Sequence, residues 1–143
     1  VVRHTISITI SNSGSTPAHT YQIAIPGSMF DRLASINAFD NAGKELDITR
    51  RTTDQNEKAT ILFDVGIDPL ATGSEMKIRV TMAFIRILAP LPANIAQNEN
   101  QLVKYVDNHF FYSPYPTVYQ KTEVRLPSQA IESHSEEPPT HAK

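Results

Sequence analysis

The sequence predicts an all-β fold: an antiparallel β-sandwich of about eight short strands, Ig-like in its general architecture. Apolar and polar residues alternate with a period of two through several segments of the 143-residue chain, and many of the apolar ones are β-branched. Turn-forming residues separate these segments at short intervals. The pattern predicts no helix of two full turns, and parallel strands would need long helical crossovers. The strands are therefore expected to be antiparallel.

The first part of the chain predicts two strands, one helical turn and a hairpin. Residues 5–10 alternate strictly, with isoleucine at every second position, and residues 21–25 alternate again until Pro26 and Gly27. Residues 28–34 are the one weakly helical stretch, with Ser28 as its candidate cap. Residues 36–39 and 44–48 flank a four-residue turn that contains Asn and Gly, which predicts a hairpin. A polar loop follows at residues 50–58.

The second part predicts further strands and a change of character near the end. Strands are expected at residues 59–65, 76–84, 102–106, 108–113 and 118–126, and Asp68-Pro69 with Thr72-Gly73 marks the turn between the first two. Two prolines require residues 89–92 to be extended. Residues 128–143 are polar and contain two adjacent prolines. We therefore expect one β-sandwich domain at residues 1–127 and a linker at 128–143 that leads toward a second domain.

Composition excludes several classes of protein. The formal net charge is -2, whereas a dedicated nucleic-acid binder needs a basic surface. No apolar stretch reaches the length of a membrane span. The chain has no cysteine, so neither disulfides nor thiolate metal sites can form.

The sequence does not predict a catalytic, cofactor or metal site. Its five histidines show no metal-binding spacing, and its five glycines form no phosphate-binding loop. One enzymatic alternative stays open, a site assembled around Asp107, His109 and Ser113. Ser113 precedes a proline and lacks the glycine-flanked turn of a serine nucleophile, which argues against that alternative.

An aromatic segment is the most distinctive part of the chain and the candidate structural or interface motif. On a strand, Phe110 and Tyr112 would face one side and Phe111 the other. We expect the first two rings to fill the core, the third to be less buried, and two prolines to fix a corner before the last strand. The alternative is a binding surface. The motif comprises Asn108, His109, Phe110, Phe111, Tyr112, Ser113, Pro114, Tyr115 and Pro116.

Residues 108–117, Asn-His-Phe-Phe-Tyr-Ser-Pro-Tyr-Pro-Thr, resemble a motif of the ribophorin I family. The similarity extends over residues 67–133, through Asp68-Pro69 upstream and residues 124–133 downstream. Ala89 and Leu91 depart from that family, where a His and a Tyr are expected.

The resemblance implies a first luminal domain of a non-catalytic subunit of oligosaccharyltransferase in the endoplasmic reticulum. That complex transfers a dolichol-linked oligosaccharide to Asn in Asn-x-Ser/Thr of nascent proteins. The implied protein is a single-pass type I membrane protein whose partners are the other subunits, including the catalytic one. Its role would be complex assembly or the handling of nascent acceptor polypeptides. A stand-alone β-sandwich module for adhesion or for glycan or peptide binding is the alternative.

Overall fold

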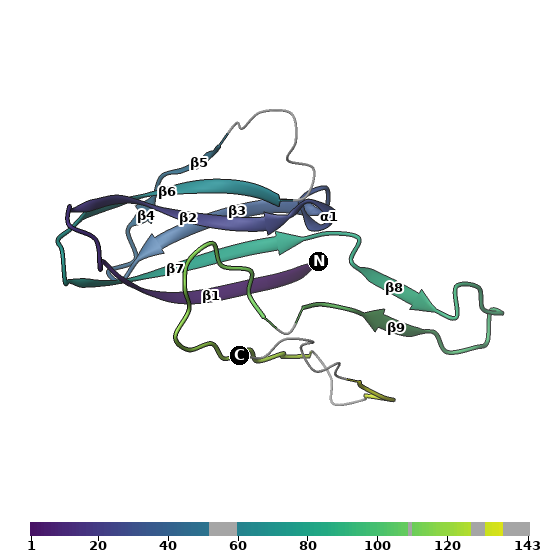
Figure 1. Ribbon diagram of the computed structural model, residues 1–143. Helices are drawn as coiled ribbons and strands as arrows, with labels where there is room; N and C mark the ends of the chain where they lie inside the picture. Colours follow the sequence, from purple (N-terminus) through teal and green to yellow (C-terminus); the bar gives the residue numbers. More distant parts are fainter. Residues whose placement is uncertain (52–59, 109, 127–130, 136–143) are drawn as a thin grey trace.

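The computed structural model describes residues 1–51, 60–108, 110–126 and 131–135. The regular secondary structure of the described residues is almost entirely β-strand, as predicted (Figure 1). The elements are β1 (Val2–Ser11), β2 (Ala18–Pro26), α1 (Gly27–Phe30), β3 (Leu33–Asp40), β4 (Glu45–Leu46), β5 (Ile48–Arg50), β6 (Thr60–Leu70), β7 (Glu75–Phe84), β8 (Leu88–Leu91) and β9 (Leu102–Tyr105). No described helix is long and apolar enough to cross a membrane.

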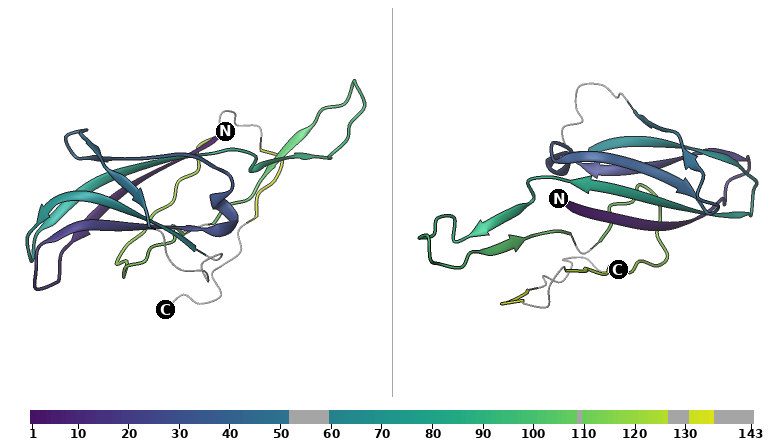
Figure 2. Two further views of the ribbon diagram at one scale, coloured as in Figure 1. Left: turned by 90° about the horizontal axis from the view of Figure 1, so that it is seen from above. Right: turned by 180° about the vertical axis from the view of Figure 1, so that it is seen from behind.

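Two antiparallel sheets form the sandwich, which confirms the predicted fold class. One sheet has the order β1-β7-β3-β4 and the other the order β2-β6-β5. The two sheets lie over one another as separate layers (Figures 1 and 2). The likeness to an immunoglobulin domain is one of architecture, because here the first strand pairs with β7 rather than with the second strand.

Alternation along the strands directs apolar side chains into the space between the sheets. The largest fully buried side chains are those of Ile23, Val65, Val80 and Phe84. β1 pairs with β7 without interruption over ten residue pairs, and its inward residues are half-buried while its outward residues are exposed. The core is therefore contributed by both sheets, and β1 forms one margin of it.

The predicted hairpin at residues 36–48 is confirmed. Ala38 pairs with Leu46, and Asp40 Oδ1 accepts hydrogen bonds from the backbone N–H of Ala42 and Lys44 at 2.8 and 2.9 Å. Gly43 has a φ of 87°, which favours glycine at that position. The chain then passes from one sheet to the other at Asp47.

Two local predictions need correction. The helical turn begins at Gly27 after Pro26 and has no side-chain cap, so Ser28 does not cap it. The turn predicted between Asp68 and Gly73 starts later than expected, because β6 continues through Asp68 and Pro69 to Leu70; it is confirmed at Thr72-Gly73, where Gly73 has a φ of 75°. β6 and β2 pair with a register shift between Ala18 and Thr20, an irregularity next to which a proline is tolerated.

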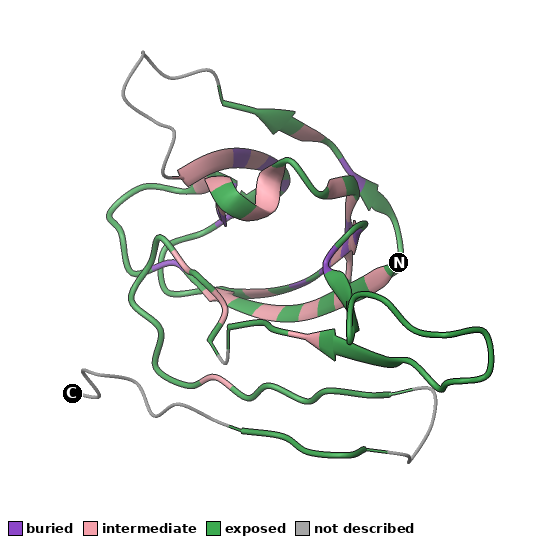
Figure 3. Cartoon of the chain, turned by 90° about the vertical axis from the view of Figure 1, so that its right-hand side faces the viewer, coloured by how far each residue is buried: buried purple, intermediate pink, exposed green. Residues whose placement is uncertain are grey.

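The predicted strands at residues 108–113 and 118–126 are also wrong for the residues that the structure describes. Residues 118–126 have the alternation of a strand, yet they form no ladder, and Val118 is 105% exposed. Figure 3 shows this part of the chain as an extended, mostly exposed line below the sandwich. Alternation indicates sidedness, but a strand also needs an edge to pair with. Pro114 and Pro116 lack the N–H groups that pairing requires.

β8 and β9 form a separate two-stranded ribbon, here called the arm (Leu88–Tyr105). It projects away from the sandwich in both figures (Figures 1 and 2). β8 confirms the extended conformation predicted for residues 89–92 as far as Leu91, whereas Pro92 lies in a bend, and β9 confirms the strand predicted at 102–106.

Candidate functional site

The chain returns from the arm to the sandwich through residues 106–108 and 110–117, here called the strap. The strap contacts β1 at its beginning and β2 near its end. β1 and β2 are the edge strands on the same side of the two sheets. Each contact uses side chains that the sequence places far apart.

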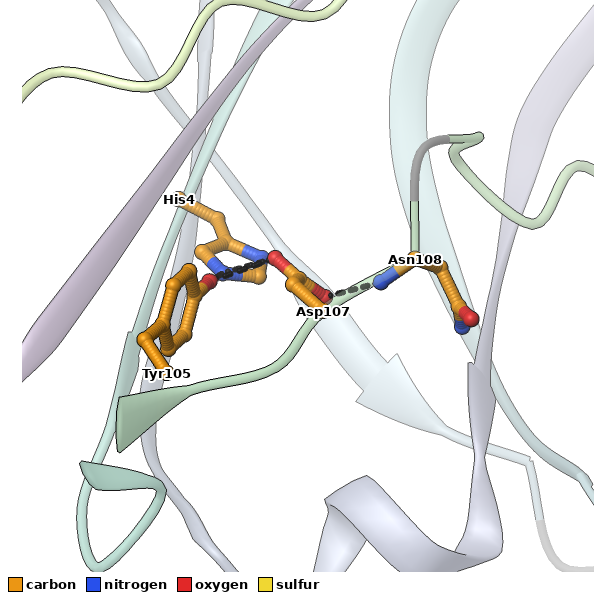
Figure 4. A network of polar contacts seen from close by, with 4 residues as sticks. All are labelled: His4, Tyr105, Asp107 and Asn108. Carbon is orange, nitrogen blue, oxygen red and sulfur yellow. Dashed lines mark hydrogen bonds and ion pairs between the residues drawn. The ribbon is translucent and has the colours of Figure 1, made fainter. Parts of the chain in front are cut away.

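The first contact is a network of three side chains (Figure 4). His4 Nε2 lies 3.1 Å from Tyr105 Oη and 3.1 Å from Asp107 Oδ2. The Tyr105 hydroxyl donates a hydrogen bond to the same carboxylate oxygen at 2.5 Å, and the backbone N–H of Asn108 donates to the other at 2.8 Å. The His4 ring also packs against Phe84, with a centroid distance of 4.8 Å. This network fastens the base of the arm to β1.

The network favours an ionised Asp107 and a protonated Tyr105. Burial opposes ionisation of Asp107, but hydrogen bonds from His4, Tyr105 and Asn108 outweigh it and lower the pKa of the carboxyl. Burial raises the pKa of the Tyr105 hydroxyl, and its hydrogen bond to the Asp107 carboxylate and the charge of that group raise it further. Both shifts keep Tyr105 protonated as the donor and Asp107 ionised as the acceptor of the hydrogen bond that links the two residues.

The second contact places Tyr115 on β2. Its ring stacks on Tyr21 with a centroid distance of 4.9 Å and an interplanar angle of 28°. Its hydroxyl oxygen accepts a hydrogen bond from the backbone N–H of Gln22 at 3.1 Å. Because β2 is an edge strand, this bond satisfies a backbone donor that β6 does not reach. Tyr115 therefore covers part of the β2 edge.

Ser113 holds the strap in the shape that this contact requires. Its hydroxyl donates to Tyr115 O at 3.1 Å and accepts from Tyr115 N–H at 3.2 Å. Burial raises the pKa of the Tyr21 hydroxyl, and the neighbouring Ser113 hydroxyl partly offsets that rise. These bonds make Ser113 a structural residue of the strap.

The three central rings of the aromatic motif are oriented opposite to the prediction. Phe111 is half-buried and packs against the core, whereas Phe110 is 48% and Tyr112 is 54% exposed. The prediction assumed a strand that continues a sheet, with both outer rings turned inward. The strap instead crosses the edges of the sheets, so one ring reaches the core between them.

The described residues do not support the enzymatic alternative at Asp107, His109 and Ser113. Asp107 is engaged by His4 and Tyr105, while Ser113 is engaged by the backbone of Tyr115. His109 lies outside the described residues. Among the residues that are described, no group of three or more His, Asp or Glu side chains is placed to hold a metal ion.

Sequence reasoning missed His4 and Tyr105, the two partners of Asp107. A signal for the first was present, because His4 occupies an inward position in the alternation of β1, where the neighbouring inward residues are apolar. A polar ring at such a position needs a hydrogen-bond partner. Nothing in the sequence indicated the partner of His4, because His4 and Tyr105 lie 101 positions apart.

The fold and the site together define a β-sandwich domain with a projecting arm and an aromatic strap across one pair of edges. Comparison with known proteins places that domain in a family. The sequence profile of the Ribophorin I family matches residues 1–143, and the chain belongs to this family.

Curated relatives agree with this assignment. The chain is 30% identical over 141 residues to Dolichyl-diphosphooligosaccharide–protein glycosyltransferase subunit 1B of Arabidopsis thaliana, covering 93% of this chain and 30% of the relative. It is 26% identical over 144 residues to subunit 1A of the same plant, covering 94% of this chain and 24% of the relative. Subunit 1 of Caenorhabditis elegans is 28% identical over 127 residues, covering 87% of this chain and 21% of the relative. The chain thus spans less than a third of the length of these relatives.

Proposed function

We propose that this chain is a luminal domain of a non-catalytic subunit of oligosaccharyltransferase in the endoplasmic reticulum. In this role it supports the transfer of dolichol-linked oligosaccharide to Asn in Asn-x-Ser/Thr of nascent proteins. The observation that carries the proposal is membership of the Ribophorin I family over residues 1–143, together with relatives named as subunits of that glycosyltransferase.

The contacts of the site support a structural contribution rather than a chemical one. Asp107 and Ser113 are the described members of the alternative catalytic site, and both are engaged in contacts that fasten the strap. A general base or a nucleophile must instead direct its reactive atom toward a substrate. The domain would therefore act through assembly with the other subunits or through the handling of acceptor polypeptides.

The whole motif from Asn108 to Pro116 is proposed as structural and interfacial at once. Phe111 and Tyr115 contact the sandwich, while Phe110 and Tyr112 present about half of their surface to solvent. Residues 128–143 are proposed as a linker to a further domain, since the relatives are more than three times as long as the matched region.

Purification of the complex through an affinity tag on this chain tests the proposal. We expect oligosaccharyltransferase activity on an Asn-x-Thr peptide to co-purify with the tagged chain, and the 143-residue chain alone to be inactive. Ser113→Ala and Asp107→Asn should leave the turnover of the assembled complex unchanged. Loss of turnover in a variant that still assembles, or transfer by the chain alone, would show that the site is catalytic.

A further inference from the structure

The arm is apolar on both of its faces, which is unusual for an exposed ribbon. Leu88 pairs with Tyr105 and Leu91 pairs with Leu102, so opposite residues share a face and neighbouring residues alternate. The exposed fractions are 44% for Leu88, 50% for Leu91, 44% for Leu102 and 63% for Val103. One face carries Leu88, Pro90, Val103 and Tyr105, and the other carries Ala89, Leu91, Leu102 and Lys104.

Both ends of the arm are anchored to the sandwich. On the β8 side, Ile87 is buried in the core and Arg86 adopts a φ of 57°, a conformation that costs free energy in a residue other than glycine. On the β9 side, Tyr105 and Asp107 bind His4. A two-stranded ribbon with uncovered faces is only marginally stable by itself. The sandwich nevertheless holds this one in a defined direction.

The tip of the arm is mostly polar, with Ile95 as its one large apolar side chain, and is closed by its own hydrogen bonds. Gln101 Nε2 donates to Pro92 O at 2.9 Å, and Glu99 Oε2 accepts from the backbone N–H of Ala96 at 2.9 Å. A lipid surface would meet this polar tip before it met the apolar strands behind it, which disfavours membrane insertion. The exposed polar residues of the tip are Asn94, Gln97, Asn98, Glu99, Asn100 and Gln101.

Two copies of the chain could not cover the arm either. Pairing edge to edge would leave both faces in water, and packing face to face would cover one face of each arm. The ribbon has only four residue pairs. The area that two such ribbons can bury against each other is well below the roughly 1,200–2,000 Å² that a stable interface buries. An occupant that covers both faces must be a groove, and the rest of its interface must lie elsewhere.

We propose that the arm inserts between two apolar walls of a groove on another protein subunit, with a carboxylate of that groove facing Lys104. Lys104 is the one charged side chain among the eight strand residues of the arm, so it sets the charge that the groove must complement. The partner is a subunit of the complex named above, and the proposal rests on that proposed function.

Cysteine accessibility tests the two-walled groove. The chain has no cysteine, so Leu102→Cys and Val103→Cys introduce single thiols on adjacent residues with opposite faces. Thr9→Cys, exposed on β1, is the matched control. Alkylation by a maleimide is measured in the free 143-residue chain and in the purified complex, against the same complex without the substitution. We expect both arm thiols to react about tenfold more slowly in the complex and the control to be unaffected, because a packed interface excludes water.

Each other outcome overturns the proposal in a recognisable way. Unprotected arm thiols in an intact complex mean that the arm is not an interface, and protection of one thiol alone means a flat surface. Protection in the free chain that grows with its concentration means a second copy, and protection by phosphatidylcholine–phosphatidylserine vesicles means lipid. Protection in a longer version of the chain that carries the further domain but is free of other subunits means that the groove belongs to the same polypeptide. Failure of the unsubstituted chain to assemble overturns the proposed function itself, and this proposal with it.

A charge reversal tests the carboxylate. Lys104→Glu should lower the recovery of the complex about fivefold or more, while Lys104→Arg retains it, since only the former places like charges together. Lys77→Glu, also an exposed lysine but on β7, is the control and should assemble normally. Equal recovery of Lys104→Glu and the parent would remove the carboxylate from the proposal.

Discussion

Phe110 and Phe111 are adjacent, chemically identical and differently placed, which makes them a matched pair for testing how the strap packs. Truncating a fully buried phenylalanine costs about 3–5 kcal/mol. Phe111 is half-buried against the core, so Phe111→Ala should cost roughly half of that, about 2 kcal/mol. Phe110 is 48% exposed, and Phe110→Ala should cost less than about 1 kcal/mol.

Thermal unfolding of the two variants, followed by circular dichroism, measures the difference. For a chain of this size, 1 kcal/mol corresponds to a shift of roughly 3–5 °C in Tm. We therefore expect Phe111→Ala to melt about 6–10 °C below the parent and Phe110→Ala within about 4 °C of it. If Phe110→Ala melts as low as Phe111→Ala or lower, the strap does not pack as described, and the original prediction of an inward Phe110 would be restored.

Three further predictions concern the same region. The pKa of Asp107 is lowered in the folded chain, so its contribution to stability is present above the ordinary value of 3.8 and is lost as the pH falls through the folded value. The unfolding free energy of Asp107→Asn should therefore depend less on pH below about 4 than that of the parent. An unchanged pH profile would contradict the network. Tyr115→Phe keeps the ring but leaves the Gln22 N–H without its acceptor, so the free energy of unfolding measured in urea should fall by about 0.5–1.5 kcal/mol. An unchanged free energy of unfolding would mean that water replaces the hydroxyl. Brief digestion with trypsin should cut after Lys121 and Arg125 before it cuts within β7, and mass spectrometry of the fragments measures the order. Early cleavage in β7 would contradict the exposure of residues 118–126.

Much of the sandwich could be predicted because its strands alternate and their turns have specific chemistry. The alternation of β1 and β7 agrees with their burial along their whole length, and the hairpin at residues 36–48 follows from its Asn and Gly. In these segments the local pattern and the tertiary partner agree. The sequence therefore contained the information needed for the two layers.

The strap and the arm could not be predicted in the same way, because their conformation depends on distant partners. Residues 118–126 also have a period-two pattern, but they have no strand to pair with among the described residues. The orientation of Phe111 depends on the edges that the strap crosses, and the Asp107 network depends on a histidine near the other end of the chain. Period-two patterns contain no information about such long-range neighbours.

The contacts of the strap also determine when the domain can be completed during synthesis. All strands of the two main sheets lie within the first 84 residues, so they can pair before the arm and the strap have been made. The partner of His4, Tyr105, is made 101 positions later, and the partner of the Gln22 backbone, Tyr115, is made 93 positions later. Until residue 115 has emerged, the edges of β1 and β2 lack these contacts, and unpaired edges are where a growing β-protein is most prone to wrong association. Of these contacts, those of the strap are consequently the last that synthesis permits, because the arm is made between the strands of the sandwich and the strap.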